Sequence, residues 1–152
     1  MMLISCDISS LVVDRLCDKP REQNIAIAYF YIDSTAREEQ FPRNILGSLL
    51  KQIVSRLERI PDEISKTFRN YKTAIGVKRP GVLDILWMMQ TVASLRPTFI
   101  CIDALDQCTE WHLPMVLGFL RLILEKSPYT RIFLTGRPHI RGQIEWYSHI
   151  SK

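Results

Sequence analysis

The chain has 152 residues, of which 47% are hydrophobic and 24% charged, the proportions of one globular domain long enough to bury a core. Its net charge of +4 comes from 20 Lys and Arg residues spread among 16 acidic ones, without the dense basic stripe of a nucleic-acid-binding surface, so we expect no nucleic-acid partner. No apolar run approaches the roughly 18 residues of a membrane span, and no secretory signal opens the chain, so we expect a cytoplasmic protein without membrane contact.

The first two predicted elements are a helix and a strand. Residues 8–17 repeat apolar side chains at helical spacing, with Asp7 in the N-cap position and Pro20 just beyond the end. Residues 24–33 are rich in β-branched and aromatic side chains and end in Asp33, which predicts a strand.

A long segment, residues 33–97, separates this strand from the next one. Apolar side chains at i, i+4 spacing predict an amphipathic helix over residues 41–57. A weaker pattern predicts a helix over residues 61–71, and a third helix follows over residues 82–95. The segment is far longer than a minimal crossover between parallel strands requires, so we interpret it as an inserted helical layer.

The central stretch of the chain is T-F-I-C-I-D-A-L-D-Q-C, residues 98–108. An uninterrupted apolar run ends in Asp103, and Asp106 follows, which is the pattern of a buried strand with carboxylates at its carboxyl end. Ligands bind at that end in open α/β sheets. One carboxylate there can orient a hydrated Mg²⁺ against nucleotide phosphates, and a second can position the attacking water. The alternative is that Asp103 caps the next helix and Asp106 is a solvated loop residue.

The last predicted elements are a helix over residues 113–124, a strand over residues 131–135 and a helix beginning within residues 139–152. Arg137 follows the strand directly, so it shares an edge with Asp103 if the strands are parallel, the default where strands alternate with helices. An arginine there could form a charge-assisted contact with the γ-phosphate of a nucleotide. The alternative is a salt bridge to one of the aspartates.

Two other chemistries find little support in the sequence. The spacing of Cys101, Cys108 and His112 matches no zinc pattern, and we expect reduced, buried thiols instead. A small-molecule hydrolase using Asp106 and His112 is a third hypothesis, but no nucleophile stands in a G-x-S-x-G context.

Four strings of the chain together resemble a known family. They are I-A-Y-F-Y-I-D (27–33), F-P-R-N-I-L-G-S-L-L-K-Q-I-V-S-R-L (41–57), F-I-C-I-D-A-L-D-Q-C (99–108) and F-L-T-G-R-P (133–138). In this order they are similar to successive blocks of the NACHT NTPase domain, in its fungal, nephrocystin 3-like N-terminal form. NACHT domains belong to the STAND class of P-loop NTPases, which are nucleotide-dependent signalling switches.

The resemblance implies a fold, ligands and residue roles. The fold would be α/β, a partial P-loop NTPase-like three-layer sandwich with a parallel sheet of about three strands and the inserted helical layer. Asp103 would be the Walker B aspartate that binds Mg²⁺, and Asp106 the second acidic residue, which helps polarise water. Arg137 would be the sensor arginine, and the nucleotide would be ATP or GTP.

The chain also departs from the family pattern. It contains no G-x-x-x-x-G-K-[ST] loop, the element whose amides and lysine bind phosphates. Gln107 stands where the family usually has Glu, and Gly136 where it usually has Ser. We therefore expect residues 1–152 to be a single partial NACHT-like domain that lacks the Walker A strand and loop and is truncated at its C-terminus. Such a form would have impaired nucleotide binding and no NTPase activity.

Loss of the Walker A strand has a structural consequence. Residues 130–135 would present an unpaired apolar edge, which predicts self-association or a protein partner there. The alternative function is a non-catalytic protein–protein interaction module that uses the helical layer 41–95 as its partner surface. Exposure of Trp87, Trp111 or Trp146 would support this alternative, because aromatic residues are enriched at interface hot spots.

Overall fold

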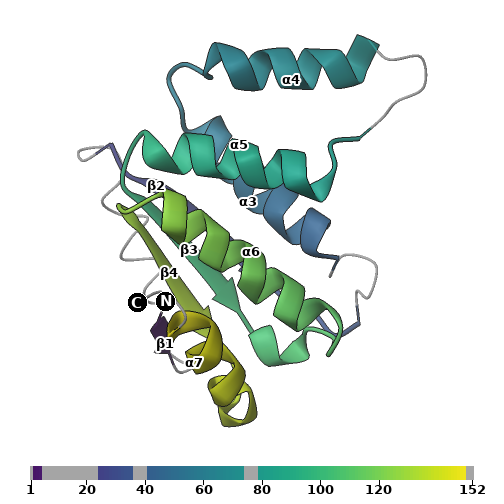
Figure 1. The fold of residues 1–152 in the computed structure, drawn as a ribbon, viewed down its shortest axis with the longest axis vertical. Coiled ribbons are helices and arrows are strands. Elements are labelled where there is room, and N and C mark those ends of the chain that lie inside the picture. The colour runs from purple at the N-terminus through teal and green to yellow at the C-terminus, as the bar shows by residue number, and fades with distance from the viewer. Residues whose placement is uncertain (1, 5–23, 36–40, 74–78, 150–152) are drawn as a thin grey trace.

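A parallel β-sheet of four strands forms the centre of the molecule (Figure 1). The computed structural model describes residues 2–4, 24–35, 41–73 and 79–149, and all structural statements concern these residues. The strands lie in the order β1-β4-β3-β2, and all three pairings are parallel. Their bounds are β1 (Met2–Ile4), β2 (Ala26–Tyr31), β3 (Thr98–Asp103) and β4 (Thr130–Thr135).

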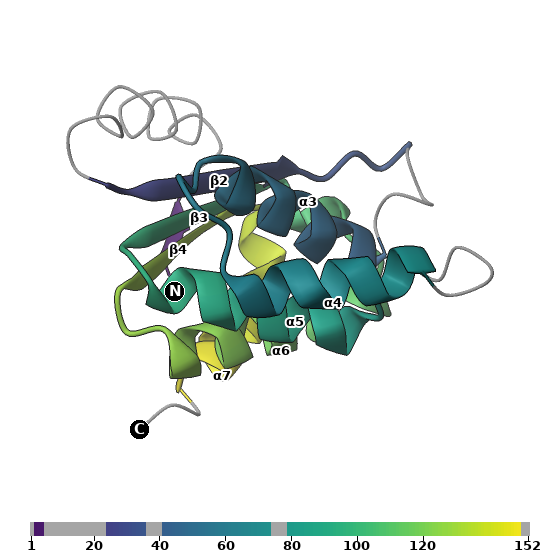
Figure 2. The ribbon, with the colours of Figure 1, turned by 90° about the horizontal axis from the view of Figure 1, so that it is seen from above.

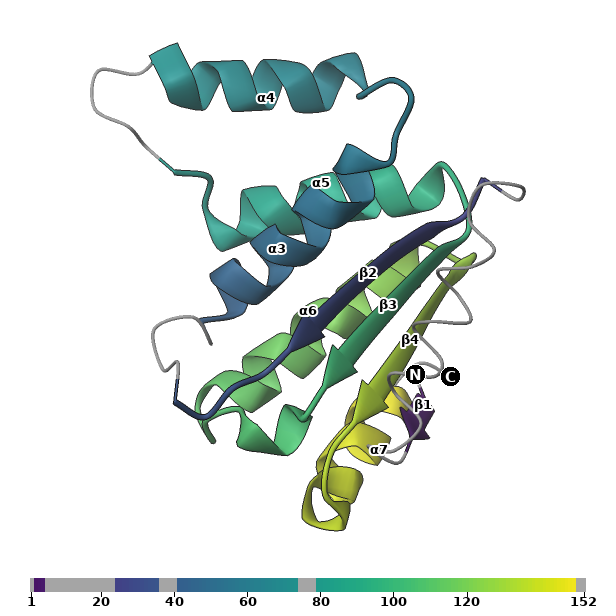
Figure 3. The ribbon, with the colours of Figure 1, turned by 180° about the vertical axis from the view of Figure 1, so that it is seen from behind.

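Helices cover one face of this sheet (Figures 2 and 3). Three of them lie nearest to the strands, α3 (Pro42–Ser55), α5 (Val82–Ser94) and α6 (His112–Lys126). Figures 1 and 2 show α4 (Asp62–Thr73) lying over α5, away from the sheet. The short 3₁₀ turn η3 (Pro138–Ile140) leads into α7 (Arg141–His149), which packs against α6.

The core lies between the sheet and the three nearest helices. Ile100 and Ile102 of β3 are fully buried, as are Leu49 of α3 and Leu117 of α6, and all four belong to one apolar cluster. Burial of each such side chain stabilises the fold by about 1.5–3 kcal/mol. The i, i+4 spacing on α3 places its apolar side chains on the face turned toward this core, and Pro42 begins the helix, where its fixed φ is favourable.

The structure confirms most of the predicted elements, with end points that differ by a few residues. The three predicted strands correspond to β2, β3 and β4, and the inserted layer is α3, α4 and α5. The helix predicted over residues 8–17 lies outside the described residues. Among the described residues, no helix combines the length and apolar character that crossing a membrane requires.

One prediction about the sheet is wrong. Residues 130–135 are not an unpaired edge, because β1 pairs with β4 in parallel, with Met2 opposite Phe133 and Ile4 opposite Thr135. The sequence reasoning missed β1 because three residues are too few to show a periodic pattern. The new strand covers the carboxyl half of β4.

Candidate functional site

Asp103 ends β3 and is held between the ends of two strands. Its Oδ1 accepts hydrogen bonds from the Ala104 amide at 2.9 Å and from the Thr135 hydroxyl at the end of β4. The Thr135 hydroxyl also accepts from the same Ala104 amide, at 3.0 Å. The backbone carbonyl of Asp103 accepts from the Ile32 amide at 3.1 Å, which ties in the end of β2. The carboxylate is therefore fixed by its surroundings and is not a helix cap.

The residue after Asp103 has an unusual backbone conformation. Ala104 has φ 57° and ψ 43°, the left-handed region, which costs a non-glycine residue about 1–2 kcal/mol. Its amide is held by the two acceptors just described, and its side chain is buried. This turn directs the chain into the 3₁₀ turn η2 (Leu105–Gln107), whose Leu105 is fully buried. Such conformations persist where the surrounding contacts fix them, and they cluster at functional sites.

Asp106 and Arg137 form an ion pair across the ends of β3 and β4. The Asp106 Oδ1 accepts from the backbone amide of Arg137 at 3.1 Å, and Oδ2 lies 3.4 Å from the Arg137 Nε. The Asp106 side chain is 7% exposed, whereas the Arg137 side chain is 77% exposed. A buried carboxylate requires such partners, so Asp106 depends on this contact more than Arg137 does. The salt bridge weighed against a phosphate contact for Arg137 is thus present.

Gly136 allows these two strand ends to approach closely. A Cβ atom at this position would lie 2.6 Å from Ile140 Cδ1 and 3.3 Å from the backbone nitrogen of Asp106. The Ile140 side chain has some freedom to shift, but the backbone of Asp106 is fixed by its turn. The glycine that replaces the serine usual in the family therefore has a packing reason.

Gln107 makes a contact that the sequence reasoning missed. Its Oε1 accepts a hydrogen bond from the backbone amide of Ser34 at 3.1 Å, which joins η2 to the segment after β2. Asp33 lies in that same segment, fully exposed, and two hydrogen bonds from Thr35 hold the pKa of its carboxyl below the usual value. We name the residues at and just after the carboxyl ends of β3 and β4 the carboxyl edge: Asp103, Asp106, Gln107, Thr135, Gly136 and Arg137. Spacing within the sequence gives no signal for the Gln107 contact, because Ser34 is remote along the chain.

The thiols behind the carboxyl edge are protonated near neutral pH. Burial raises the pKa of both Cys101 and Cys108 to about 11, and the negative charge of Asp103 adds to the effect at Cys101. Both are free and buried, as predicted for reduced thiols. Neither is therefore available as a thiolate ligand or nucleophile at neutral pH.

The surroundings of the His112 ring do not favour a role in acid–base chemistry. Its ring centroid lies 4.9 Å from that of Phe41, and its buried Nδ1 has no hydrogen-bond partner among the described residues. A hydrolytic Asp–His pair needs a hydrogen bond from the carboxylate to that nitrogen or to Nε2. The structure gives no support through Nδ1 for the pairing of Asp106 with His112.

The three tryptophans are all exposed. The exposed fractions are 41% for Trp87 on α5, 85% for Trp111 before α6 and 60% for Trp146 on α7. Their exposure is the observation that favours an interaction surface.

The oxygen donors of the carboxyl edge are of the type that Mg²⁺ prefers. Asp103 offers a carboxylate and Thr135 a hydroxyl, both held at the end of a rigid strand. In the described part of the chain, no three or more His, Cys, Asp or Glu side chains gather into a metal cage. Mg²⁺ at nucleotide sites is bound by one or two such groups and keeps water and phosphate oxygens as its other ligands. The donor set fits that mode of binding.

The parallel sheet, its strand order and the helices over it define the class of fold, a P-loop NTPase-like α/β domain. The family comparison is more specific, since the family described as "Nephrocystin 3, N-terminal" matches residues 7–137. The chain belongs to this family. No curated protein matches its sequence.

Solved structures share the fold at low sequence identity. Drosophila ORC bound to DNA superposes with a TM-score of 0.57 and 15% identity, over 93% of this chain and 32% of that one. The Aeropyrum pernix ORC1 protein in complex with DNA gives 0.51 and 13%, over 96% of this chain and 35% of that one. The chain thus spans about a third of the length of these proteins.

These structures correct the prediction that nucleic acid is excluded as a partner. Both are complexes with DNA, so the fold is one found in DNA-bound proteins and the exclusion is wrong. The density of basic residues along the sequence does not say where basic side chains gather in space, so it could not exclude a nucleic-acid partner.

Proposed function

We propose that this chain is a NACHT-type nucleotide-binding signalling switch domain in a degenerate form, with impaired nucleotide binding. The observation that carries the proposal is the convergence of Asp103, Asp106 and Arg137 at the carboxyl ends of two adjacent parallel strands. Membership of the nephrocystin 3 N-terminal family supports it. A cytoplasmic location is part of the same proposal.

The proposal gives each of these residues a role. Asp103, whose carboxylate accepts a hydrogen bond from Thr135, would hold Mg²⁺. The Mg²⁺ would neutralise part of the negative charge of the nucleotide phosphates. Asp106 would be the second acidic residue, which helps polarise the attacking water. Arg137 would exchange its contact with Asp106 for one with phosphate, which an exposed guanidinium can do at modest cost.

We expect impaired nucleotide binding because the carboxyl edge has few groups that can bind a triphosphate. Phosphate sites of this class depend on a glycine-rich loop of backbone amides and on its lysine, and the sequence contains no such motif. Two carboxylates repel phosphate unless a metal ion lies between them. The one arginine at the edge is already paired with Asp106. We therefore expect ATP or GTP to bind weakly.

A thermal-shift titration of the full chain with Mg²⁺-ATP and Mg²⁺-GTP tests the proposal. At a nucleotide concentration equal to Kd, linkage predicts a stabilisation of about 0.4 kcal/mol and thus a rise in Tm of about 1 °C. We expect this rise at millimolar nucleotide, none at micromolar nucleotide, and none in Asp103→Asn. Asp62→Asn, which changes an exposed carboxylate on α4, is the matched control and should behave as the unchanged chain.

Two outcomes would overturn the proposal in different ways. An unchanged Tm at every nucleotide concentration would remove the nucleotide site. A shift that saturates at micromolar nucleotide and disappears in Asp103→Asn would keep the site but contradict the impairment.

A second candidate function is a non-catalytic interaction module on the same scaffold. The exposure of Trp87, Trp111 and Trp146 favours it, because large aromatic side chains are costly to leave in water and are common anchors of interfaces. A chain that folds cooperatively and ignores nucleotide would move the search to this candidate.

A further inference from the structure

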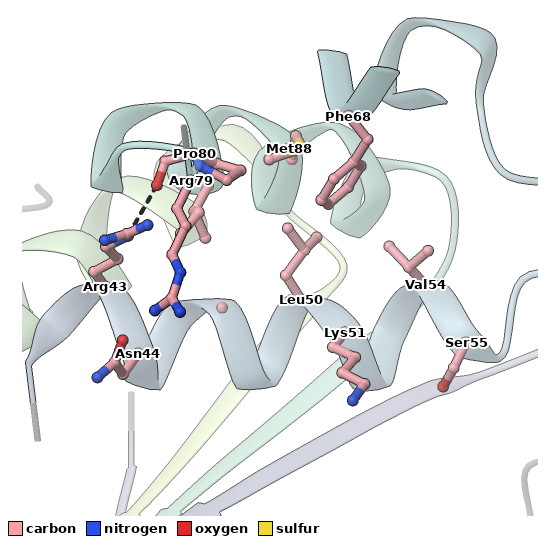
Figure 4. A pocket seen from close by; sticks show the side chains of 12 residues that line it. Arg43, Asn44, Leu50, Lys51, Val54, Ser55, Phe68, Arg79, Pro80 and Met88 are labelled. Atoms are coloured by element: carbon pink, nitrogen blue, oxygen red, sulfur yellow. Dashed lines mark hydrogen bonds between the residues drawn. The ribbon is translucent and has the colours of Figure 1, made fainter. Parts of the chain in front are cut away.

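A cavity lies between α3, α4 and the start of α5, on the side of the helices away from the sheet (Figure 4). Its volume is about 590 Å³, within the range of pockets that enclose small organic ligands. We name it the α3–α4 groove. It shares no lining residue with the carboxyl edge, so the nucleotide proposal does not account for it.

One end of the groove is apolar. Figure 4 shows Phe68 of α4 pointing down toward Leu50 and Val54 of α3, with Met88 of α5 beside Phe68. Phe68 is 38% exposed, a large fraction for an aromatic ring, whereas Met88 is fully buried. Covering an apolar wall that is open to solvent lowers the free energy, so such a wall favours the binding of an apolar group.

The other end of the groove carries two arginines. The Arg43 Nε donates to the Pro80 carbonyl at 2.9 Å, which fixes the orientation of its guanidinium, and Arg79 reaches across toward α3 (Figure 4). No acidic residue lines the groove, and no ion pair of the described residues includes either arginine. Two cations beside an apolar wall are complementary to an anion with an apolar body.

Gly47 lies in the wall of the groove, in the interior of α3. A glycine there destabilises a helix by about 0.5–1 kcal/mol relative to alanine, so a reason for it is expected. Backbone conformation and close packing do not supply one, because a Cβ at this position would meet only Ile85 Cδ1, at an ordinary 3.8 Å. The missing side chain does, however, enlarge the groove between its cationic and apolar ends.

The helices that form the walls of the α3–α4 groove are held in place, although α4 packs only loosely against the rest of the protein. Ile64 of α4 is fully buried in the core. At the other end of α4, a hydrogen bond with Asp84 of α5 raises the pKa of Tyr71. Asp84 also accepts from the Gly81 amide at 2.9 Å and so fixes the start of α5. The groove is therefore bounded by anchored elements.

We propose that the α3–α4 groove binds a small amphipathic carboxylate, with the carboxylate at Arg43 and Arg79 and the apolar body against Phe68, Val54 and Leu50. This site is separate from the nucleotide site and does not depend on it. It would let the level of an organic acid influence the stability of the helical layer.

Calorimetric titration of the full chain with sodium dodecanoate, below its micelle concentration, tests the proposal. Dodecan-1-ol, which has the same chain without the charge, is the matched ligand. We expect one dodecanoate per chain, bound at least about tenfold tighter than the alcohol, since charge-assisted hydrogen bonds contribute more than neutral ones. Equal affinities for the two ligands, or no binding of either, would overturn the proposal.

Variants separate this site from surfactant-like binding. Arg79→Gln should weaken dodecanoate about tenfold and leave dodecanol unchanged, whereas Lys126→Gln, at an exposed position on α6, should change neither. Gly47→Leu should abolish binding by filling the groove, and Gly47→Ala is its folding control. Asp103→Asn should leave dodecanoate binding intact. Binding of several molecules per chain that ignores Arg79→Gln and Gly47→Leu would contradict the site.

Discussion

The carboxyl edge and the α3–α4 groove are two candidate sites of opposite character. At the edge, the polar groups bind one another: Asp103 accepts from Thr135 and Ala104, and Asp106 pairs with Arg137. In the groove, an apolar wall lies open beside arginines that form no ion pair with described residues.

The two regions differ in how far their polar groups already bind other groups of the protein. The hydrogen bonds of the carboxyl edge stabilise the junction of β2, β3 and β4. A ligand at the carboxyl edge must compete with an ion pair inside the protein, whereas a ligand at the two arginines of the groove meets no such ion pair among the described residues. Residue identity alone therefore does not say which region binds a ligand today.

The largest effect is expected from Thr135→Val. The change keeps the shape of a fully buried side chain but leaves Asp103 without its hydroxyl partner, so we expect a loss of about 2–3 kcal/mol of stability. This corresponds to a decrease in Tm of about 5–10 °C for a chain of this size. Thr67→Val on α4, whose hydroxyl bonds only within its helix, should change stability by less than about 0.5 kcal/mol. Equal effects in the two variants would mean that the edge is not a structural junction.

A pair of glycine substitutions should give effects of opposite sign in the two regions. Gly136→Ala should destabilise the chain by about 1–2 kcal/mol, because the Cβ presses on Ile140 and on the backbone of Asp106. Gly47→Ala should stabilise it by about 0.5–1 kcal/mol, because α3 gains a better helix former without a clash. Chemical denaturation of both variants measures the signs. A destabilising Gly47→Ala would show that the groove wall has a packing constraint.

A smaller effect is expected from Arg137→Gln. The arginine is largely exposed, so screening by water limits its contribution, and we expect a loss of about 0.5–1 kcal/mol. Arg141→Gln breaks a pair with Glu145 in which both partners are exposed, and it should cost less than about 0.5 kcal/mol. Urea denaturation of both variants measures their free energies of unfolding. A larger loss in Arg137→Gln than in Arg141→Gln would show that burial of Asp106 makes its ion pair the stronger one.

The last prediction concerns the chemical reactivity of the two buried thiols and not the stability of the fold. With a pKa of about 11, Cys101 and Cys108 should alkylate about 100-fold more slowly at pH 8 than thiols of pKa near 9. The rate should rise with pH toward 11, because the thiolate is the reactive form. Peptide mapping after iodoacetamide treatment of the native chain measures it. Fast labelling of Cys101 at pH 8 would show that the region behind the edge opens readily.

Periodicity in the sequence was enough to predict β2, β3, β4 and the helical layer, because long apolar patterns report burial directly. Parallel strands also placed Asp103, Asp106 and Arg137 at one edge, as the structure confirms. The pairing of β1, the contact of Gln107 with Ser34 and the packing reason for Gly136 were not predictable. Each depends on residues remote in the chain that meet without any periodic signal.

The α3–α4 groove was equally invisible in the sequence. Its existence depends on how far α4 lies from α3, which a helical pattern on each element does not specify. The cations at its end, Arg43 and Arg79, looked like ordinary surface charges in a chain with dispersed basic residues.

Equilibrium dialysis of the full chain against Mg²⁺-ATP measures whether the carboxyl edge binds nucleotide. We expect a Kd of about 1 mM or weaker, a binding free energy of about 4 kcal/mol in magnitude, with binding lost in Asp103→Asn and unchanged in Asp62→Asn. A micromolar Kd would contradict the claim that the carboxyl edge has become mainly structural. Binding that persists in Asp103→Asn would contradict its assignment as the nucleotide site.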